Sequence, residues 1–272
     1  MAALMDFTEF TQYHVPALEQ DEPRNNLILG LIAWAARERP QRPVELWSFG
    51  EPGACALRTD PARGLVLGDL KRDHCRQLAD QVAGTRFHSV VGSGDTAPWF
   101  VEHARELGER FTKPKAQRIH ALSETPQYPG AEGSARTLTA ADTDLFAEWL
   151  LAFCAEAVPD DPVPAREAMD RKAATGDYML WVADGRPVSM AGIVRRTRAA
   201  AAIAAVYTPP AQRGRGYAGS VTAAVVEKIY AEGRATAYLY TDLANPAANR
   251  CYANIGFMPV CNSWFFLQAP PD

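Results

Sequence analysis

The sequence predicts an α+β fold in two domains that share one order of elements. The chain has 272 residues, and a typical length of about 150 residues per domain suggests two domains. Apolar periodicity predicts helix, helix, three strands, helix, strand, helix and strand in each half. Residues 123–134 are rich in turn-forming residues and have no period, which is typical of a linker.

The first half is expected to begin with two helices, the second of which ends before Pro40. Asp69 is the expected N-cap of a later helix, and Asp95 or Thr96 is the expected cap of the helix after it. The predicted elements are helices at 6–20, 25–39, 70–82 and 98–107 and strands at 44–49, 54–59, 64–67, 87–91 and 115–122.

The second half repeats this order. Thr139 or Asp142 is expected to cap its first helix, and Asp184-Gly185 predicts a hairpin turn. The predicted elements are a helix through Leu145, Phe146, Trp149, Leu150 and Phe153, helices at 165–174, 218–232 and 246–255, strands at 178–183, 188–196, 200–207 and 236–241, and two closing strands within 257–267.

Composition limits the class of protein. A net charge of -4 provides no global basic field, so nucleic acid is not an expected partner. No signal peptide is evident, and the apolar run at 27–36 is half as long as a membrane span, so we expect a cytoplasmic protein without membrane association. The five cysteines form no C-x-x-C pair and the five histidines are scattered, so no disulfide framework or metal site is predicted.

The residues with the clearest chemical meaning lie between a predicted strand and a predicted helix, at 206–218. Gly214 and Gly216 let the backbone approach a phosphate group without obstruction by a Cβ atom. A helix start offers free backbone N–H groups and a favourable dipole for an anion. Arg213 and Arg215 are able to neutralise phosphate, or either is a solvated surface charge, and for Arg215 the two alternatives are equally compatible with the sequence.

Two motifs resemble the GNAT acyltransferase superfamily. The run Arg213-Gly214-Arg215-Gly216-Tyr217-Ala218 matches the superfamily's pyrophosphate signature, (Q/R)-x-x-G-x-(G/A). A later block is similar to a second superfamily motif, through Asn245, Ala248, Tyr252 and Gly256-Phe257. The resemblance covers about residues 134–268.

This resemblance implies two GNAT-like domains, each with a mixed, mostly antiparallel central sheet flanked by helices. Residues 1–128 would form a degenerate copy without the cofactor motif, since Gly68-Asp69-Leu70-Lys71 stands where the glycine turn would be. Residues 129–272 would form an acetyltransferase domain that uses acetyl-CoA.

The resemblance also assigns roles to residues. Backbone groups of Val206, Tyr207 and Thr208 would contact the pantetheine arm, and Tyr252 would protonate the departing thiolate as general acid. Asn245 either caps the following helix or contacts the pantetheine. The donor-binding residues implied by the resemblance are Val206, Tyr207, Thr208, Arg213, Gly214, Arg215, Gly216, Tyr217, Ala218 and Asn245.

Two questions stay open in the sequence. The strand at 199–206 carries no carboxylate, so the amine's proton goes either to water or to one of four carboxylates, Glu156, Asp160, Asp161 and Asp242, which are otherwise ordinary surface groups. The acceptor is a small-molecule or peptide amine of unidentified structure. An alternative function is a catalytically silent acyl-CoA-binding or sensor protein.

Overall fold

The structure is a computed structural model that describes residues 3–38, 40, 44–60, 63–112, 114–128 and 130–270. The chain forms two compact units. The first contains Met1–His120, Tyr240–Asn245 and Pro259–Asp272, and the second contains Ala121–Leu239 and Pro246–Met258. The predicted domains are contiguous, whereas these units are not, because the last strand of the chain pairs with the strand Ser89–Ser93 of the first unit.

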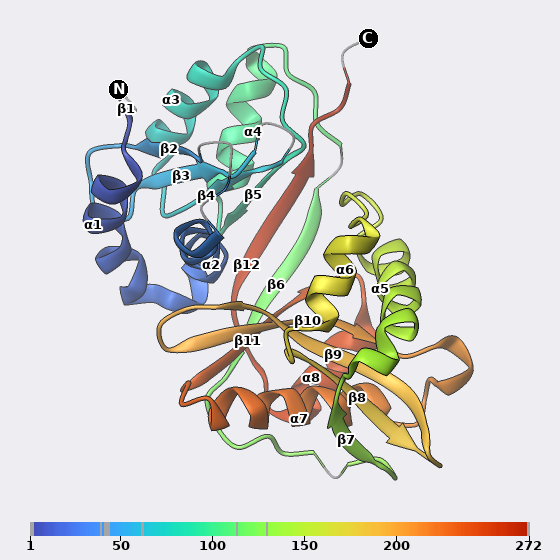
Figure 1. Ribbon diagram of the computed structural model, residues 1–272. Coiled ribbons are helices and arrows are strands. Elements are labelled where there is room, and N and C mark those ends of the chain that lie inside the picture. Colours follow the sequence, from blue (N-terminus) through green and yellow to red (C-terminus); the bar gives the residue numbers. More distant parts are fainter. Residues whose placement is uncertain are drawn as a thin grey trace. The chain divides into compact units, whose positions relative to one another are not determined.

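The predicted order of elements is present in the first half (Figure 1). A two-residue strand at the start and a short 3-10 helix (Glu19–Asp21) are additional. The elements are β1 (Ala3–Leu4), α1 (Phe7–Leu18), α2 (Glu22–Glu38), β2 (Glu45–Ser48), β3 (Cys55–Arg58), β4 (Leu65–Leu67), α3 (Arg72–Val82), β5 (Ser89–Ser93), α4 (Thr96–Glu106) and β6 (Lys115–Leu122).

The second half has the same order after one additional strand, β7. The strand at 178–183, the strand at 200–207 and the helix at 246–255 have the predicted bounds. The elements are β7 (Ser134–Thr137), α5 (Thr143–Ala157), α6 (Arg166–Ala173), β8 (Tyr178–Ala183), β9 (Arg186–Arg196), β10 (Ala200–Tyr207), α7 (Tyr217–Ala231), β11 (Thr236–Asp242), α8 (Pro246–Ile255) and β12 (Met258–Leu267).

Each unit contains a mixed, mostly antiparallel sheet, as predicted. In the first unit the strand order is β1-β2-β3-β4-β5-β12-β6, and β4 and β5 run parallel. In the second unit the order is β11-β10-β9-β8-β7, and β10 and β11 run parallel. The parallel pair therefore occupies the same place in both repeats, joined by α3 in the first and by α7 in the second.

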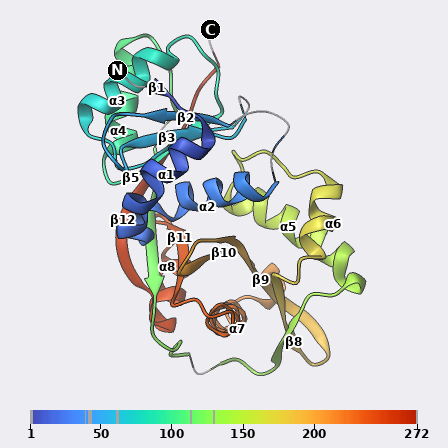
Figure 2. The ribbon, with the colours of Figure 1, turned by 60° about the vertical axis from the view of Figure 1, so that its left-hand side comes forward.

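The sheet of the second unit is covered on both faces. Helix α7 packs on one face and α5 on the other (Figures 1 and 2). Val221, Val225 and Ile229 of α7 are fully buried against the sheet, as their helical spacing predicts. Phe146 and Leu150 of α5 belong to the separate cluster on the opposite face. These two cores hold β10 and the start of α7 in place.

Several local predictions were wrong. Asp69 does not cap α3, whose N-cap is Lys71; the Asp69 carboxylate instead lies 3.1 Å from Arg24. Residues 257–267 form one strand, β12, rather than two. Strand β7 was not predicted, since its four residues carry no alternating apolar pattern. Of the two expected caps of α5, Asp142 stands at the N-cap without a side-chain cap bond, while Thr139 and Asp142 together form a capping box at the short 3-10 helix Ala140–Asp142 ahead of it.

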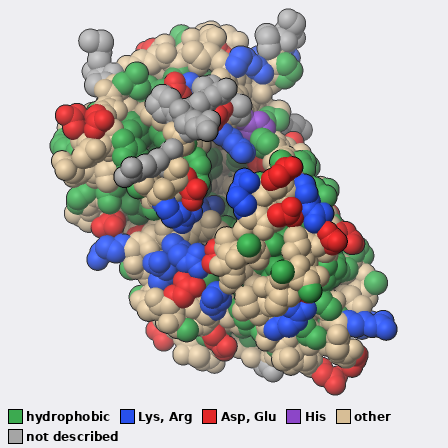
Figure 3. Space-filling view, in the orientation of Figure 1, with side chains coloured by type: hydrophobic (Ala, Val, Ile, Leu, Met, Phe, Trp, Pro, Cys, Tyr) green, Lys and Arg blue, Asp and Glu red, His purple; other side chains and the backbone are tan. Residues whose placement is uncertain are grey.

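None of the helices in the described part of the chain is long and apolar enough to cross a membrane. Acidic and basic side chains both occur on the face shown in Figure 3, in keeping with the small net charge of -4.

His103 links α3 to α4 and predicts a pH dependence of stability. Its Nε2 lies 2.9 Å from Asp80 and its Nδ1 lies 2.8 Å from Glu106. Both ring nitrogens donate to carboxylates only in the imidazolium, so the Asp80 contact first, and then that of Glu106, raises the pKa of His103. The resulting stability is fully present below the unfolded-state pKa of about 6.5 and is lost as pH rises through the higher folded-state value.

We therefore expect the difference in thermal midpoint between the wild type and His103→Gln to shrink between pH 6 and pH 8.5. Thermal unfolding followed by circular dichroism checks this. A difference that grows with pH would contradict the assignment.

Candidate functional site

The turn after β10 brings the predicted glycines to the start of α7. Gly214 and Gly216 have φ values of 77° and 82°, a left-handed conformation that glycine adopts at little cost. Gly216 is the N-cap of α7, and among the described residues no side chain accepts a hydrogen bond from the first turn of this 15-residue helix. The backbone N–H groups of that turn, including those of Tyr217 and Ala218, therefore form an anion-binding arrangement.

Strand β10 is irregular in its second half. Ala205 has a φ of 53°, which is unusual for a residue with a side chain, and the register with β9 shifts between Ala204 and Tyr207. Ala201 and Ile203 face the cluster under α7, whereas Ala205 and Tyr207 face the cluster under α5. A bulge thus reverses which face the side chains occupy, and Val206 now packs on the α7 side.

A buried serine holds this bulge. Ser189 of β9 is fully buried, and its hydroxyl donates to the Tyr207 carbonyl over 2.9 Å. The Thr208 and Ser189 hydroxyl oxygens are 2.8 Å apart. Because the Ser189 hydrogen goes to the carbonyl, Thr208 donates to Ser189. The sequence reasoning did not find Ser189 or Ala205, since a bulge leaves no periodic signal.

Arg213 is engaged by the protein itself. Its Nε donates to the Thr208 carbonyl over 2.9 Å, and its Nη2 donates to both carboxylate oxygens of Glu156 at 2.9 and 2.7 Å. The guanidinium also lies 5.9 Å from the centre of the Tyr207 ring. The ion pair is about half exposed, so its contribution to stability is small, but it ties the turn to the last turn of α5.

Arg215 is exposed and makes no hydrogen bond or ion pair with the described residues. Of the two arginines that the motif offered for phosphate, Arg215 is therefore the one whose charge is unused. Asn245 lies in the turn directly before α8 and is exposed.

Tyr252 lies on α8 within the core under α7. It is 9% exposed, and its ring packs edge-on against Phe257 at a centroid distance of 6.1 Å. Burial first, and the neighbouring Cys251 thiol second, raise the pKa of the Tyr252 hydroxyl above its usual value. The hydroxyl makes no hydrogen bond with a described residue. It is thus a protonated donor at neutral pH without a partner in the described chain.

The four candidate bases occupy different settings. Glu156 is paired with Arg213. Asp160 and Asp161 are exposed in the turn after α5. Asp242 accepts from the backbone N–H of Ala244 over 2.8 Å and so closes the turn before α8. In the described residues no group of three or more His, Cys, Asp or Glu side chains is placed to hold a metal ion.

Tyr128, from the predicted linker, was missed by sequence reasoning. Its hydroxyl donates to the Gly216 carbonyl over 3.0 Å. A Cβ atom at Gly219 would come within 2.4 Å of the Tyr128 ring, so a glycine is required there for the ring to lie against α7. The segment around Tyr128 has no periodicity. The only signal in the sequence is a glycine inside a predicted helix, at Gly219, which leaves room for a large side chain from elsewhere.

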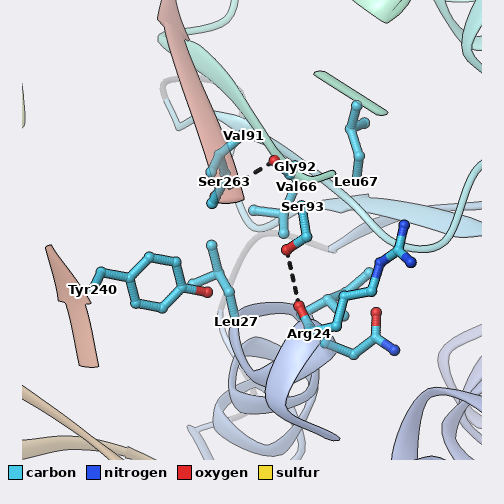
Figure 4. A pocket seen from close by; sticks show the side chains of 11 residues that line it. Arg24, Leu27, Val66, Leu67, Val91, Gly92, Ser93, Tyr240 and Ser263 are labelled. Carbon is cyan, nitrogen blue, oxygen red and sulfur yellow. Dashed lines mark hydrogen bonds between the residues drawn. The ribbon is translucent and has the colours of Figure 1, made fainter. Parts of the chain in front are cut away.

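The equivalent region of the first unit differs. A pocket of about 10 Å³, room for roughly one water molecule, lies beside the ends of β4 and β5 (Figure 4). The Ser93 hydroxyl donates to the Arg24 carbonyl beside it. The Arg24 side chain pairs with Asp69, the residue that stands in the glycine turn's place. This pocket is too small for a cofactor.

Residues 143–257 match the family described as Acetyltransferase (GNAT) family, so the chain contains a GNAT domain. The match supports acyl transfer as the general class of activity. No curated protein matches the sequence significantly.

Three solved structures show how far the fold extends. A Drosophila protein is 13% identical with a TM-score of 0.70 and covers 98% of each chain. A GCN5-related N-acetyltransferase of Sphaerobacter thermophilus is 16% identical with a TM-score of 0.66, over 100% of this chain and 96% of its own. A tandem GNAT protein from the clavulanic acid biosynthesis pathway is 14% identical with a TM-score of 0.54, and the match covers 90% of this chain and 88% of that protein. At these identities the likeness concerns the fold, which here includes a tandem arrangement.

The contact between Tyr128 and Gly219 predicts that Gly219→Ala lowers the thermal midpoint when Tyr128 is present and raises it when Tyr128 is replaced by alanine. Gly219→Ala adds a helix-favouring residue but forces the Tyr128 ring to move, so we expect a lower thermal midpoint. In a Tyr128→Ala background the obstruction is gone, and we expect the same substitution to raise the midpoint. Equal effects of Gly219→Ala in both backgrounds would contradict the contact.

Proposed function

We propose that the protein is an N-acyltransferase that moves an acetyl group from acetyl-CoA to a primary amine by direct attack. The observation that carries this proposal is the combination, in one unit, of an uncapped helix start after two left-handed glycines, a bulged strand leading into it, and a buried tyrosine without a partner. The GNAT family, to which residues 143–257 match, generally uses acetyl-CoA.

The residues present suit a coenzyme A thioester. The N–H groups at Gly216, Tyr217 and Ala218 would bind the pyrophosphate, with Gly214 leaving room for it and Arg215 adding an uncommitted positive charge. Backbone groups of Val206, Tyr207 and Thr208 would contact the pantetheine arm, because the bulge interrupts the regular register of β10 there. Asn245 would lie beside the arm or support the start of α8. Arg213 would act by holding the turn, since its Nε donates to Thr208 and its Nη2 to Glu156.

Tyr252 would act as general acid. The amine nitrogen forms a bond to the acyl carbon, the carbon–sulfur bond breaks, and the Tyr252 hydroxyl supplies its proton to the departing thiolate. The raised pKa of Tyr252 keeps that proton available at neutral pH. The tyrosinate recovers a proton from solvent, and the amine gives up its own to water.

Loss of the amine's proton to solvent is consistent with the positions of the acidic residues near the proposed site. Glu156 is neutralised by Arg213, and the strand β10 carries no acidic residue. Positioning of a neutral amine beside the thioester supplies most of the rate in such a reaction. The acceptor would be a small-molecule or peptide amine.

The same observations favour one alternative. An engaged Arg213 and a β10 without a base are also compatible with a protein that binds acyl-CoA without turnover. Thiol release in the presence of an amine panel separates the two functions.

Tyr252→Phe is the sharpest test of the chemistry. Loss of the hydroxyl should leave acetyl-CoA binding intact and lower turnover by about 10²- to 10⁴-fold, the usual contribution of a general acid. Thiol release with dithionitrobenzoate measures turnover, and the shift of the thermal midpoint with acetyl-CoA measures binding. Cys251→Ala, one residue away on the same helix, is the matched control and should keep both.

Unchanged turnover in Tyr252→Phe would remove this tyrosine from the mechanism. An absence of any thermal shift of the wild type with acetyl-CoA would refute both the enzyme and the binding protein.

A further inference from the structure

Residues Ser123–Tyr128 and Gly130–Glu132, called the strap here, run along the whole length of α7. At the C-terminal end of the helix, the Tyr230 hydroxyl donates to the carbonyls of Leu122 and Glu124 over 2.8 and 3.1 Å. At the N-terminal end, the Tyr128 hydroxyl donates to Gly216, and the Ala131 N–H donates to Ser220 Oγ over 2.7 Å.

The strap also contacts α8. Its Gln127 N–H donates to the Ile255 carbonyl at the end of that helix over 2.9 Å. Tyr128 and Cys251 both pack against the cluster that contains Tyr252. The strap is therefore an ordered part of the second unit, tied to both helices that frame the proposed donor site.

The Tyr128 bond fixes one peptide plane. The Gly216 carbonyl and the Tyr217 N–H belong to the same planar unit and point in opposite directions. That carbonyl accepts from the backbone N–H of Ser220 over 3.1 Å, from the Ser220 hydroxyl over 3.3 Å and from the Tyr128 hydroxyl over 3.0 Å. Holding the carbonyl toward the helix and the strap therefore aims the Tyr217 N–H out of the helix start, where the proposed pyrophosphate would lie.

Outside α7, Tyr128 supplies the one hydrogen bond that the described residues donate to this carbonyl. Gly214 has no heavy atom within 4 Å of its would-be Cβ position, and residues 213–216 are all exposed. Arg213 anchors the opposite end of the turn, at Thr208 and Glu156. Arg213 before Gly214 and the Tyr128 bond at Gly216 therefore hold the two ends of a segment in which glycine leaves the backbone many allowed conformations.

We propose that Tyr128 is a positioning residue for the acyl donor, which sets donor affinity by orienting the N–H of Tyr217 through its hydrogen bond to the Gly216 carbonyl. This inference rests on the proposed function, since it concerns the same donor site. Tyr128 acts through the turn rather than on the reacting atoms. Its half-buried position raises the pKa of its hydroxyl, which keeps it a donor.

The chain offers a matched pair of tyrosines for the test. Tyr128→Phe and Tyr230→Phe each remove one hydroxyl that donates to backbone carbonyls between the strap and α7, at opposite ends of the helix. A purely structural role of the strap predicts similar effects of the two. A positioning role predicts an effect on the donor in Tyr128→Phe alone.

Titration calorimetry with acetyl-CoA measures the dissociation constant of each variant. We expect Tyr128→Phe to bind about three- to tenfold more weakly, the effect of one hydrogen bond, and Tyr230→Phe to bind like the wild type. The thermal midpoints of the two unliganded variants should fall by similar amounts. An unchanged dissociation constant in Tyr128→Phe, or an equal weakening in both variants, would overturn the proposal.

The wild type separates this failure from a failure of the proposed function. A wild type that does not bind acetyl-CoA contradicts the donor site itself. A wild type that binds it while Tyr128→Phe binds equally well contradicts only the role of Tyr128.

Discussion

The first turn of α7 has backbone N–H groups that no side chain caps, and the proposed site depends on this. A helix start ordinarily satisfies these groups with a serine, threonine, aspartate or asparagine at the N-cap. Here the N-cap is Gly216 in a left-handed conformation, which offers the turn no side-chain acceptor. The helix therefore retains its capacity for an anion, and the surrounding contacts hold the turn without filling it.

The strand that leads into this turn is irregular at its end. Ala205 adopts a conformation that costs on the order of 1–3 kcal/mol for a residue with a side chain. Ser189 stabilises the distorted segment from a fully buried position. The cost of the bulge is offset by packing on both faces, since Tyr207 reaches the α5 core while Val206 stays on the α7 side.

Much of the fold follows from apolar periodicity. Strand β10 and helix α8 have the predicted bounds because each is a clean periodic run between strong turn residues. The parts that could not be predicted depend on partners distant in sequence. Asp69 fails as a cap because Arg24, 45 positions earlier, pairs with its carboxylate. Strand β7 lacks an apolar pattern and exists through its pairing with β8.

In the candidate site, too, some residues were predicted from local motifs and others depend on partners distant in sequence. The glycine turn and Tyr252 were predicted from motifs, and each lies on the element that its spacing predicts, while their roles stay predictions. Tyr128 stands in a segment without periodicity. Its contact with α7 is seen only in the structure, where its ring occupies the place that a side chain at Gly219 would take. Arg213 was predicted as a phosphate ligand, and its bonds to Glu156 and Thr208 suggest instead that it supports the turn. Side-chain pairing across elements leaves no local signal in a sequence.

The central claim is that the start of α7 and Tyr252 hold the two ends of one donor molecule. A crystal structure of the protein with coenzyme A tests it most directly. The account predicts the pyrophosphate within hydrogen-bond distance of the N–H groups of Tyr217 and Ala218, and the thiol sulfur beside the Tyr252 hydroxyl. A coenzyme A molecule bound elsewhere, or one whose sulfur lies far from Tyr252, would contradict it.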